Sequence, residues 1–284
     1  MAMIRRLIIH ADDLGLSPAV TRGILTAMTD GAVTSTSLLC NFPESRAALA
    51  SALEAGRDVG WHLNLVQGRP LSPPEKIPSL TDQKGNFLSL SRLMLRALRG
   101  GLVAGEIKRE LETQYAVFLQ TGVSPSHVDG HLHTHLFPTI REVLKTLVRE
   151  RHIPFVRVPR ETGGLPIPRW PARTLINSFG GSRPEFWRDS GAETLPFFGM
   201  ALSGRPADAT LWEKELSRNP HPIAECMVHP AYYEANEAAL LGNRGAGRAA
   251  ELDWLTGPTL RKLLKDLNYE LVSFADLKKM NKKN

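Results

Sequence analysis

The fold is decided by the first stretch of the chain, IRRLIIHADDLGLSPAVTRGILTAMTDGAVTSTSLL (residues 4–39). The segment Ile4–His10, with the apolar residues Leu7–Ile9, predicts a strand. Ser17 and Pro18 predict the start of a helix, because serine caps a helix N-terminus and proline suits the first helical position. A second strand is expected over Val33–Leu39. This strand–helix–strand order is typical of a parallel sheet with crossover helices.

The same alternation continues along the chain. We expect further strands at Val59–Leu65, His127–His135 including a trailing loop, Ile153–Val158, Ile223–Val228 and Tyr269–Phe274. We expect helices at Pro43–Glu54, Glu106–Leu119, Pro138–Arg151 and Pro258–Leu267. Seven or eight strands joined mostly through helices favour a TIM-barrel-like α/β fold, a (β/α) barrel with eight or fewer regular strands and its active site at the strand carboxyl ends. A Rossmann sheet is disfavoured because the first strand is not followed by a glycine-rich dinucleotide fingerprint.

Composition sets the expected size and class. With 284 residues, 42% hydrophobic and 23% charged, residues 1–284 are expected to form a single domain with a sizeable core. Four prolines within residues 67–86 predict that this segment is a long surface loop. Residues 159–191 are rich in Pro, Gly, Arg and Trp without periodicity, which predicts an irregular insertion or lid.

The sequence also indicates the compartment and excludes some partners. Cys40 and Cys226 lie far apart in apolar runs, which fits buried thiols in the reducing cytoplasm. The N-terminus lacks the apolar region of a signal peptide, and no stretch approaches the ~20 apolar residues of a membrane span. The formal charge is +6, but the lysines of residues 278–283 have no interleaved aromatic residues, so we expect a solvated tail and no nucleic-acid partner.

Polar residues follow four separate predicted strands. These groups are Asp12–Asp13, His62, the segment His127–His135, and His229. In a barrel the carboxyl ends of the strands meet at one face, so the four groups would form one site. Each has a simpler explanation when taken alone: the aspartates could cap a helix, and His62 could be a core histidine.

The segment His127–His135 is harder to explain by packing. Side chains of an extended chain alternate between its two sides. An extended segment would therefore place on one side His127, Asp129, His131, His133 and His135. This clustering favours metal binding or catalysis.

The residue types indicate metal-assisted hydrolysis. Two imidazoles and one carboxylate with an open position suit a single catalytic Zn²⁺, although related sites accept other divalent ions such as Mg²⁺. A second carboxylate can take the proton of the attacking water, and a histidine can donate one to a leaving amine. Asp12 and Asp13 are adjacent and point in different directions on an extended chain, so one can bind the ion while the other stays free.

Four motifs resemble the YdjC family of carbohydrate deacetylases, which includes chitooligosaccharide deacetylase and a hopanoid-associated deacetylase. They are Ala11–Ser17 (ADDLGLS), Gly60–Leu65 (GWHLNL), His127–His135 (HVDGHLHTH) and Met227–Ala231 (MVHPA). The family usually has phenylalanine where Leu14 stands here and an unbroken histidine triplet where Leu132 intervenes. Both departures leave the matching polar residues intact.

The resemblance implies a TIM-barrel-like fold, often dimeric, so a homodimer is expected. It assigns the metal to Asp13, His62 and His131, although the spacing of His127 and His131 also matches the ligand pair of NodB-type deacetylases. Asp12 would be the general base and His229 the acid. The residues expected to line or support the site are His127, Asp129, His133, His135 and Arg157. Segments 68–70 and 156–161 resemble the hopanoid-associated branch, which would act on a glycolipid.

The leading hypothesis is therefore hydrolysis of the N-acetyl group of an amino sugar, in an oligosaccharide or a glycolipid. A metal phosphoesterase or another amidohydrolase on the same barrel is a second hypothesis, but such enzymes typically open with H-x-H where this chain has His10-Ala11-Asp12-Asp13. A non-catalytic sugar-binding protein with a structural metal is a third, and it gives no role to the spare carboxylate.

Overall fold

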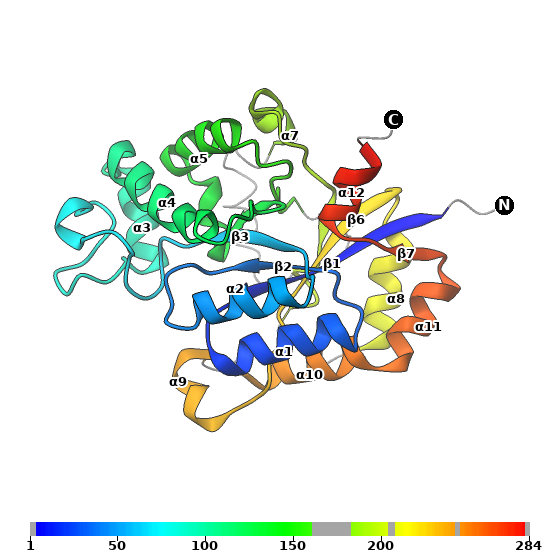
Figure 1. Ribbon diagram of the computed structural model, residues 1–284. Coiled ribbons are helices and arrows are strands. Elements are labelled where there is room, and N and C mark those ends of the chain that lie inside the picture. The colour runs from blue at the N-terminus through cyan, green and yellow to red at the C-terminus, as the bar shows by residue number, and fades with distance from the viewer. Residues whose placement is uncertain (1–3, 161–182, 204–207, 242–244, 282–284) are drawn as a thin grey trace.

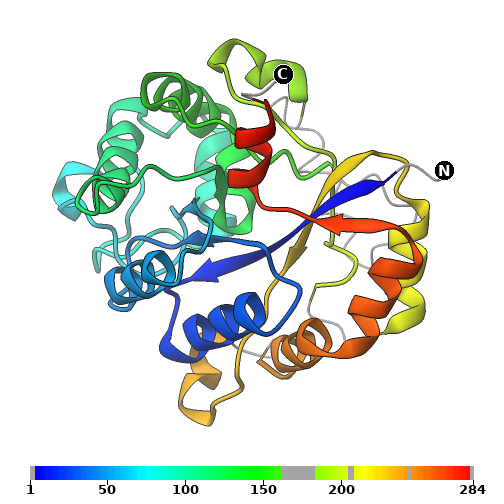
Figure 2. The same cartoon turned by 45° about the vertical axis from the view of Figure 1, so that its right-hand side comes forward.

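The computed structural model describes residues 4–160, 183–203, 208–241 and 245–281. A parallel sheet lies at the centre, and helices pack around its outside (Figures 1 and 2). The strands are β1 (Arg5–Leu14), β2 (Ser35–Leu38), β3 (Val59–Leu63), β4 (Val128–Gly130), β5 (Phe197–Phe198), β6 (Ile223–Val228) and β7 (Tyr269–Leu271).

Helices connect most of these strands. The α-helices are α1 (Pro18–Thr29), α2 (Ser45–Glu54), α3 (Leu90–Leu98), α4 (Ala104–Leu119), α5 (Pro138–Arg151), α7 (Pro184–Trp187), α8 (Ala209–Arg218), α9 (Ala238–Leu241), α10 (Gly245–Thr256), α11 (Pro258–Asp266) and α12 (Phe274–Asn281). Short 3-10 helices are η1 (Pro74–Lys76), η2 (His131–Leu136), η4 (Arg188–Ser190) and η5 (Ala235–Glu237).

The sheet is curled. Its strand order is β4-β3-β2-β1-β6-β5, with β7 also paired to β1, and every pairing is parallel. Beyond β4, Val128 bridges to Val156, and Phe155 bridges to Glu193 just before β5. Hydrogen bonds therefore run from one edge of the sheet back to the other. The predicted α/β class with a barrel-like sheet is confirmed, with seven strands in the described part.

Strand β1 separates an apolar exterior from a polar interior. Leu7, Ile9 and Ala11 belong to the large core beneath the outer helices. Ile8 points the other way, into a small cluster with Phe155 and Phe274 that fills the amino end of the interior. Because strand residues alternate, His10 and Asp12 continue on the inner side above Ile8. The interior is thus apolar at its floor and polar toward the carboxyl ends.

The expected local structure of α1 is confirmed. Ser17 is its N-cap, and its hydroxyl oxygen accepts a 3.3 Å hydrogen bond from the Val20 amide. Pro18 occupies the first turn, where its missing N–H costs nothing. The start of α1 therefore follows directly from the sequence.

Other expected elements differ from the structure. The segment His127–His135 is extended only over Val128–Gly130, and it then turns into η2, where Leu132 and His133 have positive φ angles of 51° and 57°. Helices α3 and α10 and the short strand β5 were not expected. The expected strand Ile153–Val158 is reduced to isolated bridges.

The predicted lid over residues 159–191 falls mostly on residues 161–182, which lie outside the described residues. Among the helices that are described, none is both long enough and apolar enough to cross a membrane.

Candidate metal centre

Three side chains from three separate elements converge at the carboxyl end of the sheet. Asp13 lies on β1, His62 on β3, and His131 at the start of η2. His131 Nδ1 lies 2.9 Å from Asp13 Oδ1, and His62 Nε2 lies 3.4 Å from the same oxygen. All three residues are buried, and their possible ligand atoms lie within 4.8 Å of one another. These are the residues that the family motifs assign to the metal.

The backbone of β1 explains how two adjacent aspartates reach the same site. The register between β1 and β2 shifts between Ala11 and Leu14, which is the signature of a β-bulge. Asp13 has a φ of 74°, in the left-handed region that aspartate tolerates better than most residues. In a regular strand Asp13 would point away from Asp12, toward the outer helices. The bulge turns its carboxylate toward the histidines.

The donor atoms fit a divalent cation. Asp13 Oδ1 is buried and accepts no hydrogen bond from any described residue. Each histidine has an acceptor at its other ring nitrogen: His62 Nδ1 lies 2.7 Å from Asp129 Oδ1, and His131 Nε2 lies 2.7 Å from Gln67 Oε1. Such outer partners leave the facing nitrogens free for a metal. One carboxylate and two imidazoles match the protein ligand set of a catalytic zinc site.

Charges around the cluster favour an ionised Asp13. Burial alone would raise its pKa, but the Arg248 guanidinium and His131 hold the pKa well below its usual range. Burial likewise opposes the imidazolium form of His62, yet the carboxylates of Asp129 and Asp12 raise its pKa to about 10. A proton on His62 Nε2 and a metal ion would therefore compete for the same lone pair.

Asp12 lies beside this cluster and is paired with a buried arginine. Arg157 Nη1 and Nη2 donate 2.7 Å hydrogen bonds to Asp12 Oδ2 and Oδ1 respectively. Burial raises the pKa of Asp12, and the positive charge of Arg157 opposes that rise. Two parallel hydrogen bonds fix the carboxylate plane. Asp12 is thus oriented by Arg157, and in the described part of the chain no hydrogen bond or ion pair joins it to Asp13, His62 or His131.

Arg157 also holds together the polar interior beneath the cluster. Its Nη1 lies 2.9 Å from Asp129 Oδ2, and its Nε donates a 2.7 Å hydrogen bond to Glu225 Oε1. Burial raises the pKa of Glu225 to about 7, although Arg157 lowers it. Asp129 therefore joins the arginine to His62. Arg157 thus contacts three carboxyl groups with a single positive charge.

His229 lies at the end of β6, next to Asp12. Its Nε2 is 3.9 Å from Asp12 Oδ2, and its Nδ1 is 3.1 Å from the hydroxyl of Ser203. The backbone N–H of His229 donates a hydrogen bond to Glu251 on α10. Its side chain is 18% exposed, which makes it more accessible than the converging residues. Burial, with a further contribution from Arg248, lowers its pKa to about 3, so the ring is neutral at pH 7.

The remaining histidines do not share one face, so the expected period-two arrangement of residues 127–135 is wrong beyond Gly130. His127 lies deeper, stacked on Phe274 with ring centroids 4.0 Å apart. His135 Nε2 lies 3.0 Å from the Arg157 carbonyl oxygen, and burial lowers the pKa of His135 to about 4. His133 packs edge-on against Phe197 at 6.2 Å. The positive φ angles in η2 account for the change of direction.

Two glycines give these rings their space. A Cβ on Gly60 would lie 2.2 Å from His127 Nε2, and a Cβ on Gly130 would lie 2.7 Å from His135 Nδ1. Neither position could carry a larger residue without moving a histidine. His127 is thus a packed residue of the interior, and His131 is the one that reaches Asp13.

Several residues of the site were missed from the sequence. They are His10, Ser37, Gln67, Glu225 and Arg248, which contact Asp12, His62, His131, Arg157 and Asp13 respectively. His10 and Glu225 could have been found, because strand alternation places polar residues on the inner face of predicted strands. Gln67 and Arg248 carried no such signal, since they come from a loop and from a helix that was not expected.

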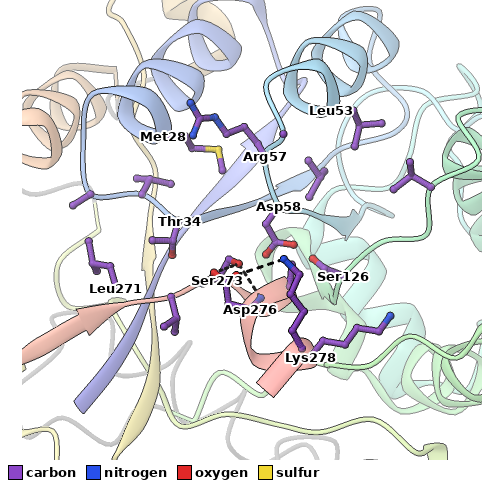
Figure 3. Close-up of a pocket in the computed structure, with 18 of the residues that line it drawn as sticks. Met28, Thr34, Leu53, Arg57, Asp58, Ser126, Leu271, Ser273, Asp276 and Lys278 are labelled. Atoms are coloured by element: carbon purple, nitrogen blue, oxygen red, sulfur yellow. Dashed lines mark hydrogen bonds and ion pairs between the residues drawn. The ribbon is translucent and has the colours of Figure 1, made fainter. Parts of the chain in front are cut away.

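A cavity of about 700 Å³ lies at the opposite end of the sheet (Figure 3). It is lined by Thr34 and Asp58, which precede β2 and β3, and by Lys278 on α12. Asp58 Oδ2 accepts hydrogen bonds from the Ser35 hydroxyl and the Phe274 amide. This cavity belongs to the amino ends of the strands and is separate from the converging Asp and His residues.

The curled parallel sheet and the buried Asp–His–His cluster at its carboxyl end define a barrel-type α/β protein with a candidate metal centre. Residues 6–266 match the sequence profile described as YdjC-like protein. The chain therefore belongs to the YdjC-like family.

Named proteins of similar sequence align with almost the whole of this chain. A chitooligosaccharide deacetylase of Yersinia pestis (strain Pestoides F) is 33% identical, with 96% of this chain and 100% of that protein covered. A carbohydrate deacetylase of Mus musculus is 32% identical, with 96% and 94% covered. The crystal structure of a candidate cellobiose-phosphate cleavage protein from Enterococcus faecalis V583 superposes with a TM-score of 0.75 at 23% identity, covering 96% of this chain and 99% of that one. This structural likeness supports the fold.

Proposed function

We propose that this protein is a metal-dependent hydrolase that removes the acetyl group from an N-acetylated amino sugar. The observation that carries the proposal is the pairing of two adjacent carboxylates with different surroundings: Asp13 faces His62 and His131, and Asp12 is held by Arg157 beside His229. The names of the Yersinia and mouse relatives support a carbohydrate N-acetyl group as the target.

Asp13, His62 and His131 would hold one divalent ion. When bound there, the ion would lower the pKa of a coordinated water and polarise the amide carbonyl. The nitrogen-rich donor set favours Zn²⁺, and Mg²⁺ is the second candidate. Asp129 and Gln67 would orient the two histidines through their outer ring nitrogens.

Asp12 would act as the general base. The attacking water gives a proton to Asp12, and its oxygen bonds to the acetyl carbon. Arg157 keeps both Asp12 oxygens in a fixed plane, so the carboxylate needs no reorganisation as the proton arrives. Burial makes Asp12 a stronger base than an exposed aspartate, because it raises the pKa.

His229 would return that proton to the leaving amine. Its low pKa makes the ring neutral before the reaction, so it must first receive a proton. Asp12 Oδ2, 3.9 Å from His229 Nε2, is the nearest source. The C–N bond then breaks, the amine takes the proton, and acetate is released, so one water is consumed for each acetyl group. Ser203 can stabilise the charged ring at Nδ1.

The test is acetate release by the purified protein from N-acetylglucosamine oligomers and from a glycolipid bearing N-acetylglucosamine. We expect release that stops on chelation and returns with Zn²⁺ or Mg²⁺. Asp12→Asn should abolish release while leaving metal binding intact, and Asp253→Asn at an exposed position is its matched control. Absence of release from every acetylated sugar, with metal present, would overturn the proposal.

Two further expectations belong to this proposal. Cys40 and Cys226 are buried thiols, which suits a cytoplasmic enzyme. A homodimer, implied by the family resemblance, is tested by light scattering of the purified chain.

A further inference from the structure

His131 has a polar partner at each ring nitrogen. Nδ1 lies 2.9 Å from Asp13 Oδ1, inside the candidate metal centre, and Nε2 lies 2.7 Å from Gln67 Oε1. An amide oxygen can only accept, so this contact requires a proton on Nε2. The neutral ring then has its lone pair on Nδ1. Gln67 thereby selects the tautomer that can bind a cation beside Asp13.

The Gln67 backbone is fixed by the residue that follows β3. Its N–H donates a 3.1 Å hydrogen bond to Asn64 Oδ1, and its carbonyl accepts one of 2.7 Å from Asn64 Nδ2. Asn41 Nδ2 donates a further 3.0 Å hydrogen bond to the same carbonyl. Asn64 is fully buried and lies two residues after His62, so one short segment carries His62 and anchors the partner of His131.

A buried side chain of α4 fixes Asn64 in turn. The Asn64 N–H donates to Gln114 Oε1 at 3.1 Å, and Gln114 Nε2 donates to the Asn64 carbonyl at 2.7 Å. Gln114 also donates to Glu110 Oε1 at 2.9 Å, and the Glu110 oxygens accept the amides of Leu71 and Ser72. The loop that carries Gln67 is therefore attached to a helix through fully buried polar groups, which are costly to leave unpaired.

The two histidines of the centre have unlike partners. His62 faces the carboxylate of Asp129, which is shared with Arg157, whereas His131 faces a neutral amide. A carboxylate makes its histidine a stronger ligand but also stabilises the charged ring, as the raised pKa of His62 indicates. A neutral acceptor orients His131 without adding charge.

We propose that Gln67 is a positioning residue that sets the tautomer of His131 and so the metal affinity of the site. This inference rests on the proposed metal-dependent function. It concerns one residue in the loop after β3, which lies outside the four motifs that define the family resemblance.

The test compares Zn²⁺ binding by the full chain and by Gln67→Ala, Gln67→Glu and Gln83→Ala, using competition with a chromophoric chelator. Gln83 is exposed in the same loop segment, residues 67–86, and is the matched control. We expect Gln67→Ala to bind Zn²⁺ about 10- to 100-fold more weakly, the usual cost of losing an outer partner of a metal ligand. Gln67→Glu should restore binding, because its carboxylate accepts the same hydrogen bond, and Gln83→Ala should match the unaltered chain.

A second readout is the imidazole ¹⁵N spectrum of the Zn²⁺-loaded chain. His131 should bind Zn²⁺ through Nδ1 with its proton on Nε2 in the unaltered protein, and Gln67→Ala should show binding through either ring nitrogen. Unchanged Zn²⁺ affinity in Gln67→Ala, or weakened affinity that Gln67→Glu does not restore, would overturn the inference. A higher KM for an acetylated sugar with unchanged Zn²⁺ affinity would overturn it too, since Gln67 would then contact substrate. Tight Zn²⁺ binding without acetate release from any sugar would contradict the proposed function alone.

Discussion

Replacing Glu225 by glutamine should make the protein more stable above neutral pH. Glu225 is buried on β6, where its Oε1 accepts a hydrogen bond from Arg157 Nε. Burial raises its pKa from an ordinary 4.5 to about 7. Between these two values the folded chain keeps a proton that the unfolded chain has lost. Stability therefore falls as the pH rises through this window and stays low above it.

The size of the effect follows from that difference. At about 1.4 kcal/mol for each pH unit between the two pKa values, ionising Glu225 costs the folded state about 3 kcal/mol. Glutamine cannot ionise, and its amide oxygen still accepts from Arg157. Glu225→Gln should thus match the unaltered protein near pH 4 and exceed its free energy of unfolding by about 3 kcal/mol near pH 8.

Urea denaturation at a series of pH values measures this difference. Glu150→Gln, which makes the same chemical change at an exposed position, should show no such pH-dependent gain. If Glu225→Gln and the unaltered protein lost stability in parallel between pH 4 and pH 8, or if the variant were the less stable one at pH 8, the described charge balance around Arg157 would be refuted.

Three further predictions concern the candidate centre and its interior. Asp129→Asn should weaken Zn²⁺ binding about 10- to 100-fold in calorimetric titrations, because His62 loses its charged partner; equal affinity would contradict this role. Metal binding should release a proton from His62 and weaken as the pH is lowered, since the ion replaces the proton that the nearby carboxylates favour. Calorimetry in buffers of different ionisation enthalpy detects this release, and identical heats in all buffers would argue against it. Gly60→Ala should lower the free energy of unfolding by about 1–3 kcal/mol, because its methyl group would overlap His127. Gly105→Ala on α4, where a Cβ meets nothing within 4 Å, is its control, and equal stability of the two variants would contradict the packing described.

The positions of most strands and the barrel-like α/β class could be anticipated from the sequence because they depend on local patterns. The strand β6 has the bounds expected, and α1 begins at Ser17 and Pro18 as their capping chemistry predicts. Parallel strands joined by helices then bring their carboxyl ends together. The convergence of Asp13, His62 and His131 agrees with the family motifs, whereas the spacing of His127 and His131 left open whether both or only one of them binds the metal.

The details of the interior could not be anticipated because they depend on backbone irregularities and on distant partners. The left-handed residues of η2 break the simple alternation on which the pattern of residues 127–135 was based, and the bulge at Asp13 breaks the alternation of β1. The pairing of Asp12 with Arg157 joins positions 145 residues apart. The free carboxylate expected from the sequence is therefore an ion-paired one, with its orientation fixed by the arginine.

The central claim is that Asp13, His62 and His131 together bind one divalent cation. Its most direct test is metal stoichiometry after dialysis, measured by elemental analysis on the unaltered chain, His131→Asn and His127→Asn. We predict one ion for each unaltered chain, loss of that ion in His131→Asn, and its retention in folded His127→Asn, because His127 packs against Phe274 away from Asp13. An unaltered chain that holds no ion after exposure to Zn²⁺ or Mg²⁺, or a His131→Asn variant that keeps a full complement, would contradict the claim.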